Sequence, residues 1–430
     1  MFSLFPPTFK NRPNGMRVDI AETLVEMGPK FFRFPGGNNL EGQTTATRWQ
    51  WNATVGSLLD RPGRVGDWGY VNTDGLGLLE YLQFFEDADM EPIMAVWSGK
   101  PLQLLVNAQA DTGTGYSLGG TSLPESQLAP YIQQAVDQIN FVIGEAGSSA
   151  PASLRASLGH PEPFTLHYVE VGNEDFFAAN TYPYRWRDFV GNLSAKFPQL
   201  TFIATSDAFD PVITPNPLAY DVHVYQTPCN FERNATKYFE GEYAAISTNP
   251  NDIFGSPSDG RLSFPTVQSA SGEAAFMTGL ERNSDIVFAA SYAPLLQHVN
   301  STQWTPDLVS FEYAFESLSD LNKGDEYIPS TLPTNGGTVH WSVTRITSTN
   351  TLNIKVANAG SSAATVAFTL PFGTVASTGT LQQITGPATA SNTPEAPNTV
   401  VPVTSTISTG KTINLNAPAF SVSLITVVAH

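Results

Sequence analysis

The first 320 residues alternate short apolar runs with helical patterns, and this alternation restricts the possible folds more than any other feature. A short apolar run without polar alternation is typical of a parallel strand that is buried on both faces. Seven runs of this kind are present: Lys30–Pro35, Pro92–Trp97, Leu166–Gly172, Leu200–Thr205, Tyr220–Tyr225, Lys237–Tyr243 and Asp285–Ala290.

Helical patterns lie between several of these runs. The first helix is expected to follow Asn14 as its N-cap and to end at Gly28. A later helix is expected to open with a capping box from Ser122 to Glu125. Further helices are indicated by apolar residues at spacings of three and four, around Leu78–Phe85 and Trp186–Phe197, and by the segment that begins at Thr266.

Strand–helix alternation over this length predicts an α/β fold of the (β/α)8 TIM-barrel type for residues 1–320. Seven strands are found where eight are needed, so we expect the barrel to lack its first strand and to be incomplete at its N-terminus. A doubly wound sheet is the alternative, but no glycine-rich phosphate loop follows any of the runs.

The character of the sequence changes near Tyr327. From there to the end, the charged residues are few and the apolar residues alternate with polar ones in short segments separated by turn residues. This pattern predicts a β-sandwich domain over residues 321–430, with the linker at Leu321–Pro329.

The net charge of −18 argues against a nucleic acid or an anionic membrane as partner, because both attract basic surfaces. No apolar run is long enough to span a bilayer. The single cysteine, Cys229, rules out an intrachain disulfide. Residues 1–7 do not resemble a signal peptide. We nevertheless expect a secreted glycoprotein, because the chain has four glycosylation sequons, at Asn52, Asn192, Asn234 and Asn300.

Two glutamates follow predicted strands. Glu174 comes directly after the run that ends at Gly172, and the active face of a TIM barrel is formed by the carboxyl ends of its strands. A carboxyl group in such a cleft can act as a general acid, although a helix cap would also place Asn173 and Glu174 there. Glu242 lies near the end of another run. Glu240 is two residues earlier and would point to the same side of the strand, so alternation cannot choose between the two. For a single glutamate here, a structural ion pair is the simpler interpretation.

Considered together, the two carboxylates match what glycoside hydrolysis requires, namely one acid and one nucleophile or base. If one strand is missing at the front of the barrel, the two glutamates follow strands four and seven. The ends of these strands face each other across the barrel mouth.

Several motifs in a fixed order make the chain resemble the fungal branch of glycoside hydrolase family 51, the α-L-arabinofuranosidases. These motifs are Phe32-Arg-Phe-Pro-Gly-Gly-Asn-Asn-Leu-Glu-Gly42, Arg61-Pro-Gly-Arg64, Trp68-Gly-Tyr70, Tyr168-Val-Glu-Val-Gly-Asn-Glu-Asp175, Phe239-Glu-Gly-Glu-Tyr243, Ser291-Tyr-Ala-Pro-Leu-Leu-Gln297 and Trp304-Thr-Pro-Asp307.

The resemblance implies a retaining, two-step mechanism that releases terminal α-L-arabinofuranosyl groups from arabinoxylan- or arabinan-type polysaccharides. It assigns Glu174 as acid/base and Glu242 as nucleophile. It also implies sugar contacts for Asn38, Asn173 and Gln297, and a role for Tyr225 in orienting the nucleophile.

Some of these residues have a second interpretation. Arg33 either lies beside a catalytic carboxylate or forms a structural ion pair under the barrel mouth. His223 shares the strand parity of Tyr225, and it is either part of the site or a core histidine. Trp68, Tyr70 and Trp97 either stack on sugars or belong to the core.

Two other functions stay open. A β-1,4-glycanase or β-xylosidase on the same clan fold would have the same two carboxylates. The missing strand and the short connection Gln226–Thr236 are also compatible with an inactive carbohydrate-binding fragment. We expect no cofactor and no metal site, because the six histidines are far apart in the sequence and no phosphate loop is present.

Overall fold

The computed structural model describes residues 6–66, 71–101, 104–105, 117–118, 121–228, 238–299, 302, 304–311, 324–331 and 337–430. The described residues fall into two compact units. The first unit contains those up to Val222 together with 238–239, and the second contains 223–228 and those from Glu240 onward. Each unit is described separately below.

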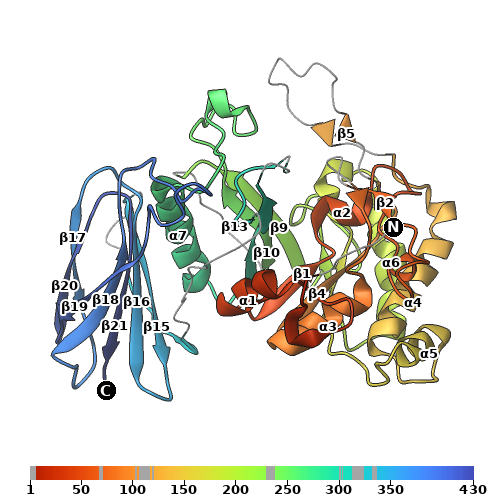
Figure 1. The fold of residues 1–430 in the computed structure, drawn as a ribbon, viewed down its shortest axis with the longest axis horizontal. Helices are drawn as coiled ribbons and strands as arrows, with labels where there is room; N and C mark the ends of the chain where they lie inside the picture. Colours follow the sequence, from red (N-terminus) through yellow and green to blue (C-terminus); the bar gives the residue numbers. More distant parts are fainter. Residues whose placement is uncertain are drawn as a thin grey trace. The chain divides into compact units, whose positions relative to one another are not determined.

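All seven predicted strands are present in one sheet, whose order is β1-β4-β7-β8-β9-β10-β11. Figure 1 labels β1, β4, β9 and β10 of this sheet. The pairs β1–β4, β4–β7, β7–β8 and β8–β9 are parallel. The strands are β1 (Phe31–Phe34), β4 (Glu91–Val96), β7 (Tyr168–Val171), β8 (Thr201–Ala204), β9 (Ala219–Gln226), β10 (Tyr238–Ala245) and β11 (Val287–Tyr292).

Helices alternate with these strands in the first unit, as the sequence predicts. They are α1 (Val18–Glu26), α2 (Gly37–Glu41), α3 (Leu78–Ala88), α4 (Ala129–Ile143), α5 (Ala150–Ser157) and α6 (Tyr182–Lys196). The predicted apolar face of α6 is buried, with Trp186 at 1% and Leu193 at 0% exposure. β4 is buried on both faces from Ile93 to Val96, which explains its continuous apolar sequence.

Two predicted helix starts are wrong. α1 begins at Val18, and Asn14 does not cap it but donates a hydrogen bond to Glu80 Oε1 at 3.0 Å. α4 begins at Ala129, with Pro130 in its first turn, rather than at the expected capping box, because Ser122 bonds to Thr181 instead. In both cases a distant polar partner competes with the local cap for the same side chain.

The second unit contains α7 (Val267–Arg282), whose first turn is closed by a capping box between Thr266 and Ser269. It also contains two antiparallel sheets, ordered β14-β15-β16-β21-β18-β19 and β17-β20 (Figure 1). Their strands are β14 (Glu326–Tyr327), β15 (Val339–Ile346), β16 (Thr351–Asn358), β17 (Ala364–Thr369), β18 (Thr378–Ile384), β19 (Val403–Ser408), β20 (Thr412–Ala417) and β21 (Ser421–Val428).

One apolar core joins the two antiparallel sheets: Ile354 and Ile425 from the larger sheet are buried together with Phe368 and Ile413 from the smaller one. The predicted fold class, a TIM-type barrel sheet followed by a β-sandwich, is therefore confirmed. β18 escaped the sequence analysis because its residues Thr378–Ile384 are mostly polar. The domain boundary at residue 320 stays a prediction, since residues 312–323 lie outside the described residues.

None of the helices within the described residues is both long enough and apolar enough to cross a membrane.

Candidate active site

The turn that follows β7 carries Asn173, Glu174 and Asp175 in the first unit. Gly172 begins it with a φ of +101°, and a Cβ atom at this position would lie 1.9 Å from Asp175 Oδ2. Only glycine fits this conformation and this spacing without strain. Glu174 itself has a φ of +46°, in the left-handed region that a residue with a side chain rarely adopts. The turn is thus shaped by its surroundings rather than by local preference.

Asp175 anchors this turn to the body of the first unit. Its side chain is fully buried, and Oδ1 accepts a hydrogen bond from Arg185 Nη1 at 2.5 Å. Thr205 Oγ1 donates to Oδ2 at 2.7 Å, and the Asp175 N–H donates to the Thr205 carbonyl at 2.8 Å. These contacts fix the backbone directly after Glu174.

Arg33 on β1 holds Asn173 from one side. Its guanidinium makes a two-pronged ion pair with Glu170 on β7, at 2.6 and 2.7 Å. The same group donates to Asn173 Oδ1 at 2.8 Å and to Asp221 Oδ2 at 3.2 Å. Burial raises the pKa of Glu170, and the Arg33 charge opposes this shift. The amide oxygen of Asn173 therefore faces a cation.

Glu41, at the end of α2, holds Asn173 from the other side. Its Oε2 accepts hydrogen bonds from Asn173 Nδ2 at 3.0 Å and from Asn38 Nδ2 at 3.2 Å. Its Oε1 lies 2.7 Å from the ammonium of Lys100. Burial raises the pKa of Glu41 to about 7, while Lys100 and Asn173 oppose the shift. Two of the predicted sugar-binding side chains thus share one buried carboxylate.

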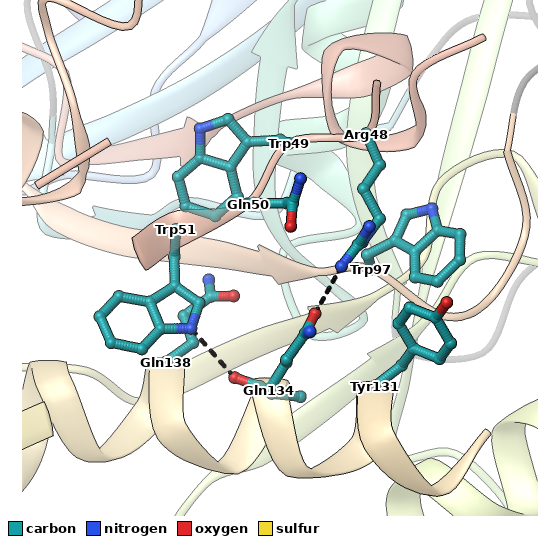
Figure 2. A pocket seen from close by; sticks show the side chains of 9 residues that line it. Arg48, Trp49, Gln50, Trp51, Trp97, Tyr131, Gln134 and Gln138 are labelled. Atoms are coloured by element: carbon teal, nitrogen blue, oxygen red, sulfur yellow. Dashed lines mark hydrogen bonds between the residues drawn. The ribbon is translucent and has the colours of Figure 1, made fainter. Parts of the chain in front are cut away.

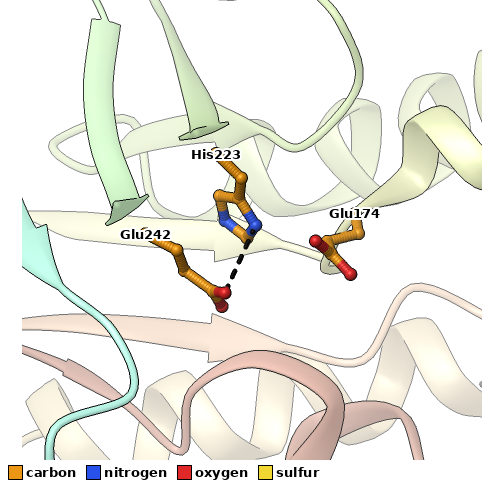
Figure 3. A group of neighbouring side chains, drawn as sticks. All are labelled: Glu174, His223 and Glu242. Carbon is orange, nitrogen blue, oxygen red and sulfur yellow. Dashed lines mark ion pairs between the residues drawn. The ribbon is translucent and has the colours of Figure 1, made fainter. Parts of the chain in front are cut away.

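In the second unit, Glu242 lies within β10 rather than at its end, because the strand continues to Ala245. The Tyr225 hydroxyl donates a hydrogen bond to Glu242 Oε2 at 2.5 Å. His223 Nδ1 lies 3.6 Å from the same oxygen, and Figure 3 marks this pair with a dashed line. Both partners project from β9, two residues apart and hence on one face.

Aromatic side chains enclose Tyr225 in the second unit. Its ring contacts the ring of Trp304 edge-on, with centroids 5.2 Å apart, and Phe254 lies beside both. The Arg261 guanidinium lies 4.4 Å from the Trp304 centroid. This packing restricts the orientations that are open to Tyr225 and so to its hydrogen bond with Glu242.

Gln297 lies on the short strand β12 (Leu296–His298), which pairs with β13 (Val309–Phe311). Its side chain is 4% exposed and accepts a hydrogen bond from Ser310 Oγ at 3.1 Å.

Comparison with known proteins supports a single assignment. The family model described as "Alpha-L-arabinofuranosidase 1 domain" matches residues 23–243, and the "Alpha-L-arabinofuranosidase C-terminal domain" matches residues 241–421. The chain belongs to the α-L-arabinofuranosidases of glycoside hydrolase family 51. This membership agrees with the resemblance that the ordered motifs indicate.

Individual arabinofuranosidases are similar over most of the chain. A solved structure of an arabinose-bound family 51 α-L-arabinofuranosidase is 71% identical, with a TM-score of 0.91 over 99% of this chain and 69% of that one. A probable α-L-arabinofuranosidase A from Aspergillus flavus is 38% identical over 79% of this chain and 54% of its own length. The α-L-arabinofuranosidase A of Aspergillus niger is 34% identical over 98% and 66%, respectively. The chain thus spans about half to two thirds of the length of these curated relatives.

Within the arabinofuranosidase fold, the predicted site residues form two groups. Arg33, Asn38 and Asn173 are joined through Glu41 and Glu170 in the first unit, beside the Glu174 turn. His223, Tyr225 and Glu242 are joined in the second unit. The roles assigned to these residues, and to Gln297, stay predictions.

Trp97 has a structural place in the first unit. It is 7% exposed, and Arg48 lies 5.0 Å from its ring centroid, with Tyr131 packed beside it (Figure 2). The cavity in this cluster has a volume of about 20 Å³, enough for about one water molecule. The core interpretation of Trp97 therefore fits its surroundings, while Trp68 and Tyr70 lie outside the described residues.

The sequence analysis missed four charged residues of the first group, namely Glu41, Lys100, Glu170 and Asp221. Asp221 and Glu170 each interrupt an apolar strand, as Arg33 does, and such interruptions are the signal that could have paired them. Lys100 could not be predicted from its sequence neighbours, because no acidic residue lies close to it along the chain.

Two of the predicted glycosylation sites, Asn52 and Asn192, are exposed, as glycan attachment requires. Asn234 and Asn300 lie outside the described residues.

Proposed function

We propose that this chain is a retaining glycoside hydrolase that releases terminal α-L-arabinofuranosyl groups from arabinoxylan- or arabinan-type polysaccharides. Family membership supports the arabinofuranoside as substrate, since the similar proteins are named for that activity and one of them holds arabinose. The observation that supports the mechanism is the pair of glutamates: Glu174 lies on the anchored turn after β7, and the Glu242 carboxylate accepts a hydrogen bond from Tyr225.

Glu242 acts as the nucleophile in this proposal. Its carboxylate attacks the anomeric carbon, the bond to the leaving oxygen breaks, and Glu174 gives its proton to that oxygen. Water then attacks the anomeric carbon of the glycosyl-enzyme, Glu174 takes the proton from the water, and the Glu242 carboxylate leaves. The sugar keeps its α configuration because the carbon is inverted twice.

The structure favours Glu242 over Glu240 for this role. Glu240 is 1% exposed, whereas the side chain of Glu242 is 13% exposed and accepts the bond from Tyr225. A nucleophile has to reach the substrate, so the more accessible carboxylate is the better candidate. Asn38, Asn173 and Gln297 would supply hydrogen bonds to the sugar hydroxyls.

Azide rescue tests both assignments with one aryl α-L-arabinofuranoside. Glu174→Ala should lose most activity and, with azide, give the α-arabinofuranosyl azide, because azide then intercepts the glycosyl-enzyme. Glu242→Ala with azide should give the β-azide, because azide replaces the nucleophile directly. Without azide, Glu242→Ala should lose at least ~10²-fold in kcat/KM. Glu174→Ala should lose at least ~10²-fold in kcat, because water then attacks the glycosyl-enzyme without a general base.

The substrate class is tested by comparing arabinofuranosyl, xylosyl and glucosyl aryl glycosides. A preference for the xyloside or glucoside would favour a xylosidase or glycanase. A wild-type rate equal to that of both alanine variants would show that this chain is not an active hydrolase.

We also infer that the protein acts outside the cell, with glycans on Asn52 and Asn192. The support is the exposure of these two sequons. An unchanged electrophoretic mobility of the protein from its native host after N-glycosidase treatment would contradict this inference.

A further inference from the structure

Lys100 is buried at the centre of the first unit, with its ammonium directed at the turn that carries Glu174. Its side chain is 3% exposed. Nζ donates to the carbonyl oxygens of Asn173 and Glu174, both at 3.1 Å, and lies 2.7 Å from Glu41 Oε1. Two of the three N–H donors of the ammonium thus bond to carbonyls of this turn, and its charge lies within ion-pair distance of the Glu41 carboxylate.

The carboxylate of Glu41 links the same lysine to the sugar-binding candidates. Its side chain is 2% exposed. Oε1 faces Lys100, while Oε2 accepts from the amides of Asn38 and Asn173. The pair therefore ties together α2, the loop after β4 and the turn after β7.

The backbone that carries Lys100 is itself held in place. The indole N–H of Trp97 donates to the Lys100 carbonyl at 2.9 Å, and the Leu123 N–H donates to the Gly99 carbonyl at 2.9 Å. Trp97 is in turn fixed by Arg48 and Tyr131 (Figure 2). A lysine on a fixed backbone, with two donors bonded to the turn and its charge paired with Glu41, holds its acceptors in a defined position.

We propose that Lys100 and Glu41 are positioning residues, which set the backbone of Glu174 and the side-chain amide of Asn173 for the glycosidase reaction. This inference rests on the proposed function. Lys100 supports the left-handed conformation of Glu174 through the carbonyl of that residue, and so directs its carboxyl group. Glu41 turns the Asn173 amide so that Oδ1 faces Arg33 and one N–H is used, which leaves the second N–H for a sugar oxygen.

The test uses the dependence of the rate on the leaving group. From a 2,4-dinitrophenyl arabinofuranoside, the dinitrophenolate leaves without needing a proton. From an arabinofuranosyl xylo-oligosaccharide, the leaving sugar oxygen needs a proton from the general acid. Lys100→Met should lower kcat/KM for the oligosaccharide by about 10- to 100-fold, because a displaced acid protonates poorly. For the dinitrophenyl substrate the loss should stay under about threefold, since that first step needs no acid.

Glu174→Ala serves as the reference. It should also lower kcat/KM more for the oligosaccharide than for the dinitrophenyl substrate, and this asymmetry between the two substrates should be larger than for Lys100→Met. Arg61→Met is the matched control, because the Arg61–Glu80 pair of the first unit is equally short and buried, at 2.6 Å with 3% and 7% exposure. Arg61→Met should lower kcat/KM by the same factor for both substrates, because it should change only the fraction of protein molecules that are folded.

Lys100→Met leaves Glu41 as an unpaired buried charge, which can prevent folding. The double variant Lys100→Met/Glu41→Gln removes both charges, and it should keep the same asymmetry because the two carbonyls still lack their donor. Equal losses on both substrates in the folded variant, or none, would overturn the positioning role while leaving the proposed function intact. A wild-type protein that cleaves neither substrate would overturn both.

Discussion

At the level of single residues, Asn173 shows how completely the first unit defines one side chain. Its amide oxygen accepts from Arg33 and its amide nitrogen donates to Glu41, so the two ends of the amide cannot exchange. Both partners are themselves paired with charges of opposite sign. A side chain held in this way loses little conformational entropy when it binds a ligand.

Tyr225 gives a prediction at the same scale. Tyr225→Phe removes the hydroxyl that donates to Glu242 at 2.5 Å and keeps the aromatic packing. A hydrogen bond to a charged group contributes about 1.5–3 kcal/mol, so kcat/KM should fall by about 10- to 100-fold. Steady-state kinetics on an aryl arabinofuranoside measures the loss.

Tyr184→Phe is the control for this prediction. It removes a hydroxyl that donates to the Leu123 carbonyl at 2.6 Å in the first unit, and kcat/KM should change by less than about twofold. If Tyr225→Phe behaved like this control, Tyr225 would have no part in holding the nucleophile.

At the level of elements, the turn after β7 depends on Gly172. Gly172→Ala would bring a Cβ within 1.9 Å of Asp175 Oδ2, and Asp175 cannot move because Arg185 and Thr205 hold it. Together with the φ of +101°, this clash should lower the free energy of unfolding by roughly 2–4 kcal/mol. Urea denaturation of the purified variant measures the change.

Gly191→Ala is the matched substitution in the same unit. Gly191 lies inside α6, and a Cβ there meets no heavy atom within 4 Å. Because alanine favours a helix over glycine, this variant should gain about 0.5–1 kcal/mol. Equal destabilisation by both alanines would mean that the space around Gly172 is not limiting.

At the level of the whole molecule, buried carboxyl groups make stability depend on pH. Burial raises the pKa values of Glu41, Glu273 and Asp307 to about 7, from ordinary values of 4.5 for glutamate and 3.8 for aspartate. Between those values and 7 the folded chain binds more protons than the unfolded chain, so the free energy of unfolding falls as pH rises. The lowered pKa values of Asp19 and Asp87 act only below that window.

The melting temperature should therefore fall between about pH 5 and about pH 8. Glu273→Gln should make this fall smaller, because glutamine does not titrate and can still accept the Ala245 N–H bond that Glu273 Oε1 accepts at 2.9 Å. One such carboxyl contributes on the order of 3 kcal/mol to the difference. Differential scanning fluorimetry at constant ionic strength checks it, and an identical slope in wild type and variant would rule Glu273 out as a source.

Local patterns in the chain were sufficient for the seven barrel strands, for the helices α1, α3, α4, α6 and α7, and for the fold class. The apolar runs predicted all seven barrel strands. For β4, β7 and β8 the reason is burial on both faces, which requires a continuous apolar segment. Alternation predicted most strands of the sandwich for a similar reason. The polar strand β18 and the two misplaced helix starts show where local patterns fail: a polar side chain can be satisfied by a neighbour that is distant in the sequence.

The contacts of the site depended on the folded arrangement. Lys100 lies 73 residues from Asn173, Glu41 lies 132 residues from it, and Arg33 lies 188 residues from Asp221. A motif can single out Glu174 and Glu242 as candidates for catalysis, because their neighbours along the chain are characteristic. No local pattern specifies which buried charges balance one another, because that depends on which strand ends are brought together when the chain folds.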